Sequence, residues 1–172
     1  FGAADNFGMS KLRMQIFIFF LGLGVTLLIA CVDYRALVDK IWLPMLIGSV
    51  LLLVLTLLFG ESGANMETSN RSWLRIPIIG MMIQPSEFVK FTFICTFSKP
   101  LFSVQERINH PLTLLPLLGH ALLIIGPILL SGDLGVALIY VGILALMLFC
   151  AGLHPGYFGA AVLLLLLLAP FL

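Results

Sequence analysis

Charge is scarce in this chain. Only 10% of its 172 residues are charged, 61% are apolar, and the mean hydropathy is +1.17. A soluble domain of this length could not cover so much apolar surface, so lipid must be part of its surroundings. The net charge is only +1 and no stripe of basic residues exists, which argues against a nucleic-acid partner.

Cysteine is also sparse. Cys31, Cys95 and Cys150 each stand alone within an apolar run, which argues against a disulfide framework or a metal site and favours small core residues. A cleavable signal peptide is absent, and the chain begins with Phe1 rather than methionine. We therefore expect a fragment of a longer protein.

Long apolar runs dominate the rest of the sequence. A helix needs about 20 apolar residues to cross a bilayer, and only helices satisfy every backbone group there. The runs predict an all-α, polytopic transmembrane helix bundle forming one membrane domain over residues 1–172. We predict five complete spans and one truncated span, at about residues 14–32, 41–59, 85–97, 112–130, 136–153 and 157–172. Residues 60–83 form a long polar loop, and basic residues divide evenly between the two sides, so charge does not orient the chain.

The strongest polar signal lies at the start of the third predicted helix. Pro85 suits a first helical turn, and Glu87 suits the positive end of the helix dipole. Glu87 and Lys90 are three residues apart, so they share a face and can pair. Because charge beside a bilayer needs partners or a water-filled cavity, neither should face lipid, and we expect the 85–97 helix to be central in the bundle. Two interpretations stay open: a structural ion pair, or a polar site that Gln84 extends.

Asp133, Arg71 and Trp73 are further candidates. Asp133 follows a tight reversal and could meet Lys90 or Glu87, although a helix-capping role would also explain it. Trp73 is typical of an interfacial anchor, but with neighbouring arginines it could also form a platform for a phosphorylated or sugar ligand. His120 and His154 have no spaced partners, which favours core or interface positions.

Four segments, in order, resemble the SEDS family (shape, elongation, division and sporulation), typified by RodA and FtsW. Asp33-Tyr-Arg35 follows the family's second helix, and Arg71-Ser-Trp73 resembles its Arg-Trp loop element. Gln84-Pro-Ser-Glu-Phe-Val-Lys90 resembles its Gln-Pro-Ser-Glu-x-x-Lys signature. Gly132-Asp-Leu-Gly135 resembles its Pro-Asp-Leu-Gly segment, with glycine in place of proline.

The resemblance implies a role for these segments. The chain would supply the second to seventh of ten helices, with the 60–83 loop and Asp133 facing outward from the bacterial cytoplasmic membrane. The implied activity is a peptidoglycan glycosyltransferase that polymerises lipid-linked disaccharide pyrophosphates into glycan strands. The implied site residues are Arg71, Trp73 and Gln84 for substrate binding and Glu87, Lys90 and Asp133 in support.

The resemblance also implies partners and limits. The family's general-base aspartate lies in a loop beyond Leu172, so we expect residues 1–172 alone to be inactive. Expected partners are membrane lipid, the lipid-linked precursor and a class B penicillin-binding protein, a transpeptidase. No covalently bound cofactor is expected, although Mg²⁺ or Mn²⁺ is compatible with a pyrophosphate substrate. A precursor flippase or transporter and a non-catalytic scaffold for the transpeptidase remain alternatives, and the elongation, division and sporulation branches are not distinguished.

Overall fold

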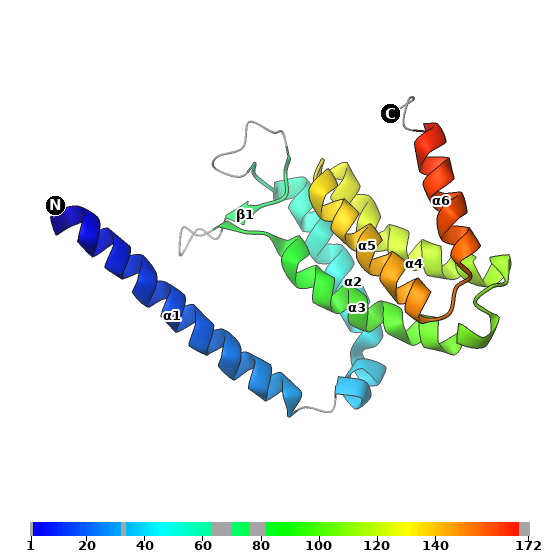
Figure 1. Ribbon diagram of the computed structural model, residues 1–172, viewed down its shortest axis with the longest axis horizontal. Helices are drawn as coiled ribbons and strands as arrows, with labels where there is room; N and C mark the ends of the chain where they lie inside the picture. The colour runs from blue at the N-terminus through cyan, green and yellow to red at the C-terminus, as the bar shows by residue number, and fades with distance from the viewer. Residues whose placement is uncertain (1, 32–33, 63–69, 76–81, 169–172) are drawn as a thin grey trace. The chain divides into compact units, whose positions relative to one another are not determined.

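The structure, a computed structural model, describes residues 2–31, 34–62, 70–75 and 82–168. These residues form six α-helices, one short 3₁₀ turn and two short strands (Figure 1). The chain divides into two units, residues 1–40 and 41–172, which are considered separately. Asp33 of the first family-like segment lies outside the described residues.

Helix α1 (Gly2–Ala30) belongs to the first unit. Its apolar part covers Leu12–Leu28, but the helix begins well before residue 14, where the sequence predicted a start. The difference arises because hydropathy marks where a segment becomes apolar, whereas polar residues can extend the same helix. The predicted core position is wrong for Cys150 of the second unit, which is exposed.

Among the residues that the structure describes, two helices are long and apolar enough to cross a membrane. They are the Val38–Phe59 part of α2 (Tyr34–Phe59) and the whole of α4 (Pro111–Leu130). Two shorter helices follow, α5 (Leu134–Cys150) and α6 (Pro155–Leu168). Many large apolar side chains of α2, α4 and α5 are exposed, as expected for helices that meet lipid or further helices. The fold is therefore a helix bundle compatible with a membrane.

Helix α3 (Pro85–Ser103) is longer than the predicted 85–97 segment. The sequence predicted a polar turn from Lys99 to Pro111, which carries Glu106, Arg107 and His110. In the structure the Lys99 ammonium instead lies 5.5 Å from the centre of the Trp42 ring on α2. This cation–π contact holds the charge against a neighbouring helix, and α3 continues past both Lys99 and Pro100 to Ser103.

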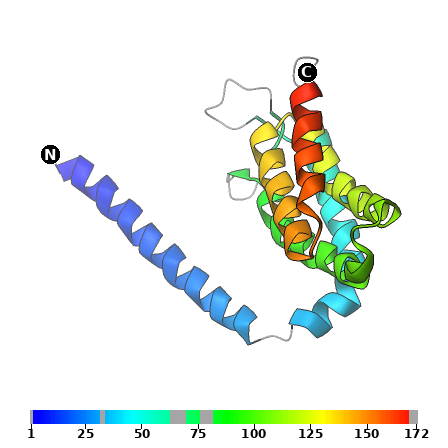
Figure 2. The same ribbon diagram turned by 45° about the vertical axis from the view of Figure 1, so that its right-hand side comes forward.

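Helix α3 packs against α4 and α5 in the second unit (Figures 1 and 2). The Thr92 hydroxyl lies 2.6 Å from that of Ser49 on α2, a partly buried contact between two helices. Phe93 and Phe97 of α3 are fully buried, and Phe93 packs on Tyr140 of α5 with ring centres 5.5 Å apart. One face of α3 is therefore buried, as expected for a central helix, whereas other large apolar side chains of α3, such as that of Phe91, are exposed.

The predicted 60–83 loop is not wholly irregular. Strands β1 (Leu74–Arg75) and β2 (Met82–Ile83) pair antiparallel, with Leu74 opposite Ile83, which the all-helical prediction missed. Trp73 also bridges to Glu61 through two backbone hydrogen bonds. Two-residue strands are too short for a periodicity to be visible in the sequence, which explains the omission.

A close backbone approach fixes where this loop leaves α2. A Cβ atom added to Gly60 would lie 2.5 Å from the carbonyl oxygen of Arg71 and 2.3 Å from that of Thr56, so only glycine fits there. The Arg71 backbone N–H then donates to the carbonyl of Ser131, between α4 and α5, at 3.1 Å. The hairpin is thereby held over the α4–α5 turn.

Candidate functional site

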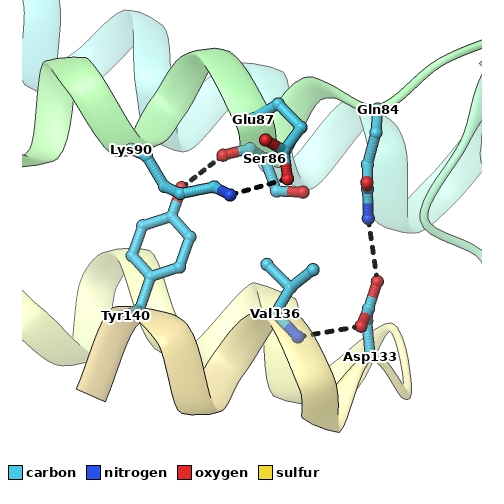
Figure 3. A network of polar contacts seen from close by, with 7 residues as sticks. All are labelled: Gln84, Ser86, Glu87, Lys90, Asp133, Val136 and Tyr140. Atoms are coloured by element: carbon cyan, nitrogen blue, oxygen red, sulfur yellow. Dashed lines mark hydrogen bonds and ion pairs between the residues drawn. The ribbon is translucent and has the colours of Figure 1, made fainter. Parts of the chain in front are cut away.

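The first turn of α3 positions Gln84. Pro85 occupies the start of the helix, where its missing N–H is harmless, as the sequence predicted. Gln84 precedes it with extended backbone, and its side chain does not cap the helix. Instead its amide Nε2 donates to Asp133 Oδ2 at 3.0 Å, joining segments 49 residues apart (Figure 3).

Asp133 makes two hydrogen bonds with its two carboxylate oxygens. Oδ1 accepts from the backbone N–H of Val136 at 3.1 Å and caps helix α5, which confirms the capping interpretation. Oδ2 accepts from Gln84. The expected contact with Lys90 or Glu87 is wrong for the part of the chain that the structure describes, because no ion pair involves Asp133 there. An uncharged amide takes that place.

Glu87 and Lys90 do form an ion pair. Lys90 Nζ lies 2.7 Å from Glu87 Oε1, and the two residues are three positions apart on α3. The Lys90 side chain is 19% exposed, whereas that of Glu87 is 53% exposed. Glu87 lies in the first turn of α3. That neither side chain faces lipid stays a prediction.

The hairpin brings Trp73 to the same end of the bundle. Leu74 pairs with Ile83, so continuing that register by one residue puts the backbone of Trp73 across from that of Gln84. Trp73 is half-buried, and Arg71, two residues earlier, is exposed. The Arg75 guanidinium binds Glu61 at 3.0 Å, whereas no ion pair of Arg71 occurs among the described residues. Of the two arginines proposed as a platform, Arg71 is the more available.

The two histidines differ in their surroundings. His120 on α4 is buried, and its Nε2 lies 3.3 Å from the Thr96 hydroxyl of α3, in contact with Phe97. The favoured core position is confirmed for His120. His154 lies in the exposed turn before α6, where its Nδ1 accepts from the Gly156 N–H at 3.1 Å.

Sequence reasoning missed Tyr140. Its phenol is fully buried and donates to the backbone carbonyl of Ser86 at 2.6 Å (Figure 3). A signal was available, because Tyr140 is seven residues after Asp133 and therefore lies on the same face of α5. Ser86 Oγ is buried with no hydrogen-bond partner among the described residues.

These residues define the polar end of the bundle, meaning Arg71, Trp73, Gln84, Glu87, Lys90 and Asp133. It offers an ammonium, a guanidinium and an aromatic ring to an anionic or sugar-bearing ligand. Both of its carboxylates already have partners, one in an ion pair and one in a cap. It is therefore better equipped to bind negative charge than to remove a proton.

The comparison with known proteins decides the family. The cell cycle protein family of FtsW, RodA and SpoVE matches residues 3–172, which is almost the whole chain. The chain belongs to this family. The assignment agrees with the resemblance of the Gln84–Lys90 and Gly132–Gly135 segments.

Relatives within the family carry related names. The chain is 33% identical over 166 residues to a probable peptidoglycan glycosyltransferase FtsW of Geobacter metallireducens, covering 96% of this chain and 42% of that protein. It is 33% identical over 154 residues to the protein of the same name in Bacillus subtilis, covering 88% of this chain and 36% of that protein. The chain thus spans about two fifths of the length of these relatives.

A solved structure shares the fold. The superposition has a TM-score of 0.69 at 27% identity and covers 92% of this chain and 46% of the other. That structure concerns the coordination of polymerization and crosslinking by a peptidoglycan synthase complex. The arrangement of helices described above is therefore one that a known peptidoglycan synthase contains.

Proposed function

We propose that this chain forms the floor and lipid groove of a peptidoglycan glycan-strand polymerase in the bacterial cytoplasmic membrane. The observation that carries the proposal is the polar end of the bundle, where the Gln84–Asp133 bond and the Glu87–Lys90 pair lie close together. Such a cluster at the end of apolar helices favours a ligand with a polar head and a lipid tail. The names of the family relatives support the same activity.

The proposed substrate is a lipid-linked disaccharide pyrophosphate, and the proposed partner is a class B penicillin-binding protein. The neighbouring solved structure joins polymerization to crosslinking in one complex, which supports a partner of this kind. We further propose that the chain supplies the second to seventh of ten transmembrane helices. The polar end of the bundle then faces outward, where the strand is built.

The proposed reaction is a glycosyl transfer. A sugar hydroxyl of one chain attacks the anomeric carbon of another, a new C–O bond forms, and the C–O bond to the lipid pyrophosphate breaks. The hydroxyl proton passes to a base, while the leaving pyrophosphate takes the electron pair of the broken bond. Catalysis therefore needs a proton acceptor at one side of the carbon and positive charge at the other.

The residues of this chain suit the second requirement. The Lys90 ammonium and the Arg71 guanidinium can bind phosphate oxygens, and Trp73 can cover a sugar ring. Glu87 is held by Lys90, and Asp133 is held by Gln84 and the cap of α5, so we assign proton removal to neither. Apolar faces of α2, α4 and α5 would contact the lipid tail.

A divalent cation fits the described residues poorly. Across residues 2–31, 34–62, 70–75 and 82–168, no three His, Cys, Asp or Glu side chains gather in a way that could hold one. Mg²⁺ or Mn²⁺ would therefore have to be carried largely by phosphate oxygens of the substrate, which are ligands that Mg²⁺ accepts readily. No step proposed above depends on the cation.

The decisive test is polymerisation of purified lipid-linked precursor by the full-length protein with its transpeptidase partner. Glycan strands that require this protein would support the polymerase. Movement of precursor across vesicles without strand formation would instead support a flippase. If strands form only from the partner's own activity, the chain is a scaffold and the proposal fails.

Lys90→Ala sharpens this test. We expect strand formation to fall by roughly tenfold or more, because a cation near the leaving group is lost. The thermal unfolding temperature should change little, since the Glu87 left behind is half exposed and exposed ion pairs contribute about 0–1 kcal/mol. Arg107→Ala, which removes an exposed cation beyond the other end of α3, serves as the control. Equal activity of the two variants would contradict a role for Lys90.

A further inference from the structure

Tyr140 connects α5 to the polar end of the bundle in a way that packing alone does not require. The residue is fully buried, and its ring packs on Phe93 with centres 5.5 Å apart. A phenylalanine would fill the same space. The hydroxyl, however, donates to the Ser86 carbonyl at 2.6 Å, and that contact belongs to a specific point of α3.

That point is the turn from which Lys90 projects. In a regular α-helix the carbonyl of Ser86 also accepts from the backbone N–H of Lys90, four residues later. A carbonyl has two lone pairs, so it can accept from the phenol and from this N–H together. The phenol therefore binds the Ser86 carbonyl, which also accepts the backbone N–H of Lys90 in a regular helix. The turn that this bond closes carries the Lys90–Glu87 ion pair (Figure 3).

Helix α5 thus holds the start of α3 at two places. Asp133, at the beginning of α5, binds the Gln84 side chain just before α3. Tyr140, two turns further along the same face, binds the Ser86 backbone just inside it. Two separated contacts fix both the position and the orientation of a helical turn. With one contact alone, the turn could still rotate about that contact.

We infer that Tyr140 is a positioning residue for the polar end of the bundle, setting the direction in which Lys90 meets the substrate. The inference rests on the proposed polymerase function. It predicts that loss of the hydroxyl, with the ring retained, loosens the first turn of α3 and moves Lys90 away from the leaving pyrophosphate. A small misplacement of a group that acts on the reacting bond slows the chemical step more than it weakens binding.

The test uses the full-length protein with its partner and two matched variants. Tyr140→Phe removes the phenol from Ser86, and Tyr157→Phe removes another phenol that donates to a backbone carbonyl, that of Asn109, at 2.8 Å. Tyr157 belongs to α6, so its loss should leave α3 unaffected. Each variant is measured for kcat and KM of strand formation, unfolding temperature, and deuterium uptake by the backbone amides of residues 87–91.

We expect only Tyr140→Phe to exchange these amides faster, with kcat reduced roughly tenfold and KM little changed. Its unfolding temperature should stay close to that of Tyr157→Phe. If both variants match the wild type in exchange and kcat, the inference is overturned. Faster exchange with unchanged kcat also overturns it, as does a kcat loss that only follows the loss of folded protein.

Failure of the proposed function would look different. If wild-type protein makes no strands, the polymerase proposal fails, and amide exchange alone decides whether Tyr140 fixes the first turn of α3. Faster exchange in Tyr140→Phe than in Tyr157→Phe then supports the structural part of the inference. Equal exchange in the two variants overturns it.

Discussion

At the scale of single residues, Asp133 makes two different interactions, one with each of its carboxylate oxygens. One oxygen caps α5 and the other accepts from Gln84, so each carboxylate oxygen serves a different neighbour. An asparagine has one carbonyl oxygen and one amide group. An asparagine at position 133 can therefore keep the cap through its carbonyl oxygen and present its NH₂ group to Gln84. Gln84 can then rotate its own amide so that its oxygen accepts this hydrogen bond.

The Asp133→Asn and Asp133→Ala pair tests whether the carboxylate itself matters. We expect Asp133→Ala to lower the free energy of unfolding by about 0.5–2 kcal/mol, the usual effect of losing a helix cap, and to reduce strand formation. Asp133→Asn should retain most of the stability and most of the strand formation, because asparagine can still cap α5 and bind Gln84. The measurements are thermal unfolding and strand formation by the full-length protein. A stable Asp133→Asn variant without activity would assign Asp133 a charge-dependent role that the contacts do not require.

At the scale of elements, the turn between α4 and α5 departs from the family segment that it resembles. Gly132 stands where the family has proline, and its φ of +81° lies in the left-handed region. Proline fixes φ near −65° and has no N–H, whereas the Gly132 N–H donates to the Leu129 carbonyl at 3.0 Å. This turn therefore uses a conformation that proline could not adopt.

Restoring the family residue should consequently be harmful. We expect Gly132→Pro to lower the free energy of unfolding by more than about 1 kcal/mol. Proline cannot adopt the positive φ of Gly132, and it lacks the N–H that donates to the Leu129 carbonyl. Strand formation should fall with it, since Asp133 follows directly. Thermal unfolding of the full-length variant is the measurement, and an unchanged unfolding temperature would show that this turn does not depend on a left-handed residue.

Alanine substitutions at two glycines with positive φ distinguish the effect of backbone strain from the effect of a turn's location near the polar end of the bundle. Gly152, between α5 and α6, also has positive φ, +93°, and an added Cβ atom would meet nothing within 4 Å. At Gly132 the added atom would lie 3.2 Å from the Asn70 side chain. Gly132→Ala and Gly152→Ala should both cost about 1–2 kcal/mol from the backbone, but only Gly132→Ala should reduce strand formation.

At the scale of the whole molecule, the chain covers about two fifths of the length of its relatives. Both carboxylates of the polar end are engaged, as described above. Many large apolar side chains of α2, α4 and α5 are exposed, so these helices have surface left for lipid or other helices. For the proposed reaction, we expect the proton acceptor to be a group other than these two carboxylates.

Residues 1–172 alone should not polymerise the precursor. We expect the purified fragment in detergent or nanodiscs to give no strands above a protein-free control, while the full-length protein does. Binding of the lipid-linked precursor by the fragment should persist, because the apolar faces and the Lys90 and Arg71 cations remain. Strand formation by the fragment would contradict this and would move the proton acceptor onto Glu87 or Asp133.

The sequence by itself determined the membrane character, the helices and the motif that marks the family. These depend on composition and on local rules, such as apolar run length, proline in a first turn and the spacing of Glu87 and Lys90. Local rules also sufficed for the cap at Asp133, because the residue and its partner Val136 are only three positions apart. They ended α3 too early, at about Phe97 instead of Ser103, and they could not show that Lys99 lies over Trp42 of another helix.

Only the tertiary structure decided which polar residues meet. Gln84 rather than Lys90 binds Asp133 across 49 residues, and Tyr140 reaches Ser86 across 54. Both pairings depend on how α5 packs against α3, and on the Gly132 turn that starts α5. The sequence shows which polar groups are able to pair, but helix packing fixes the distances between them. Hydrogen bonds form only at short distances, so helix packing decides which of these pairs exist.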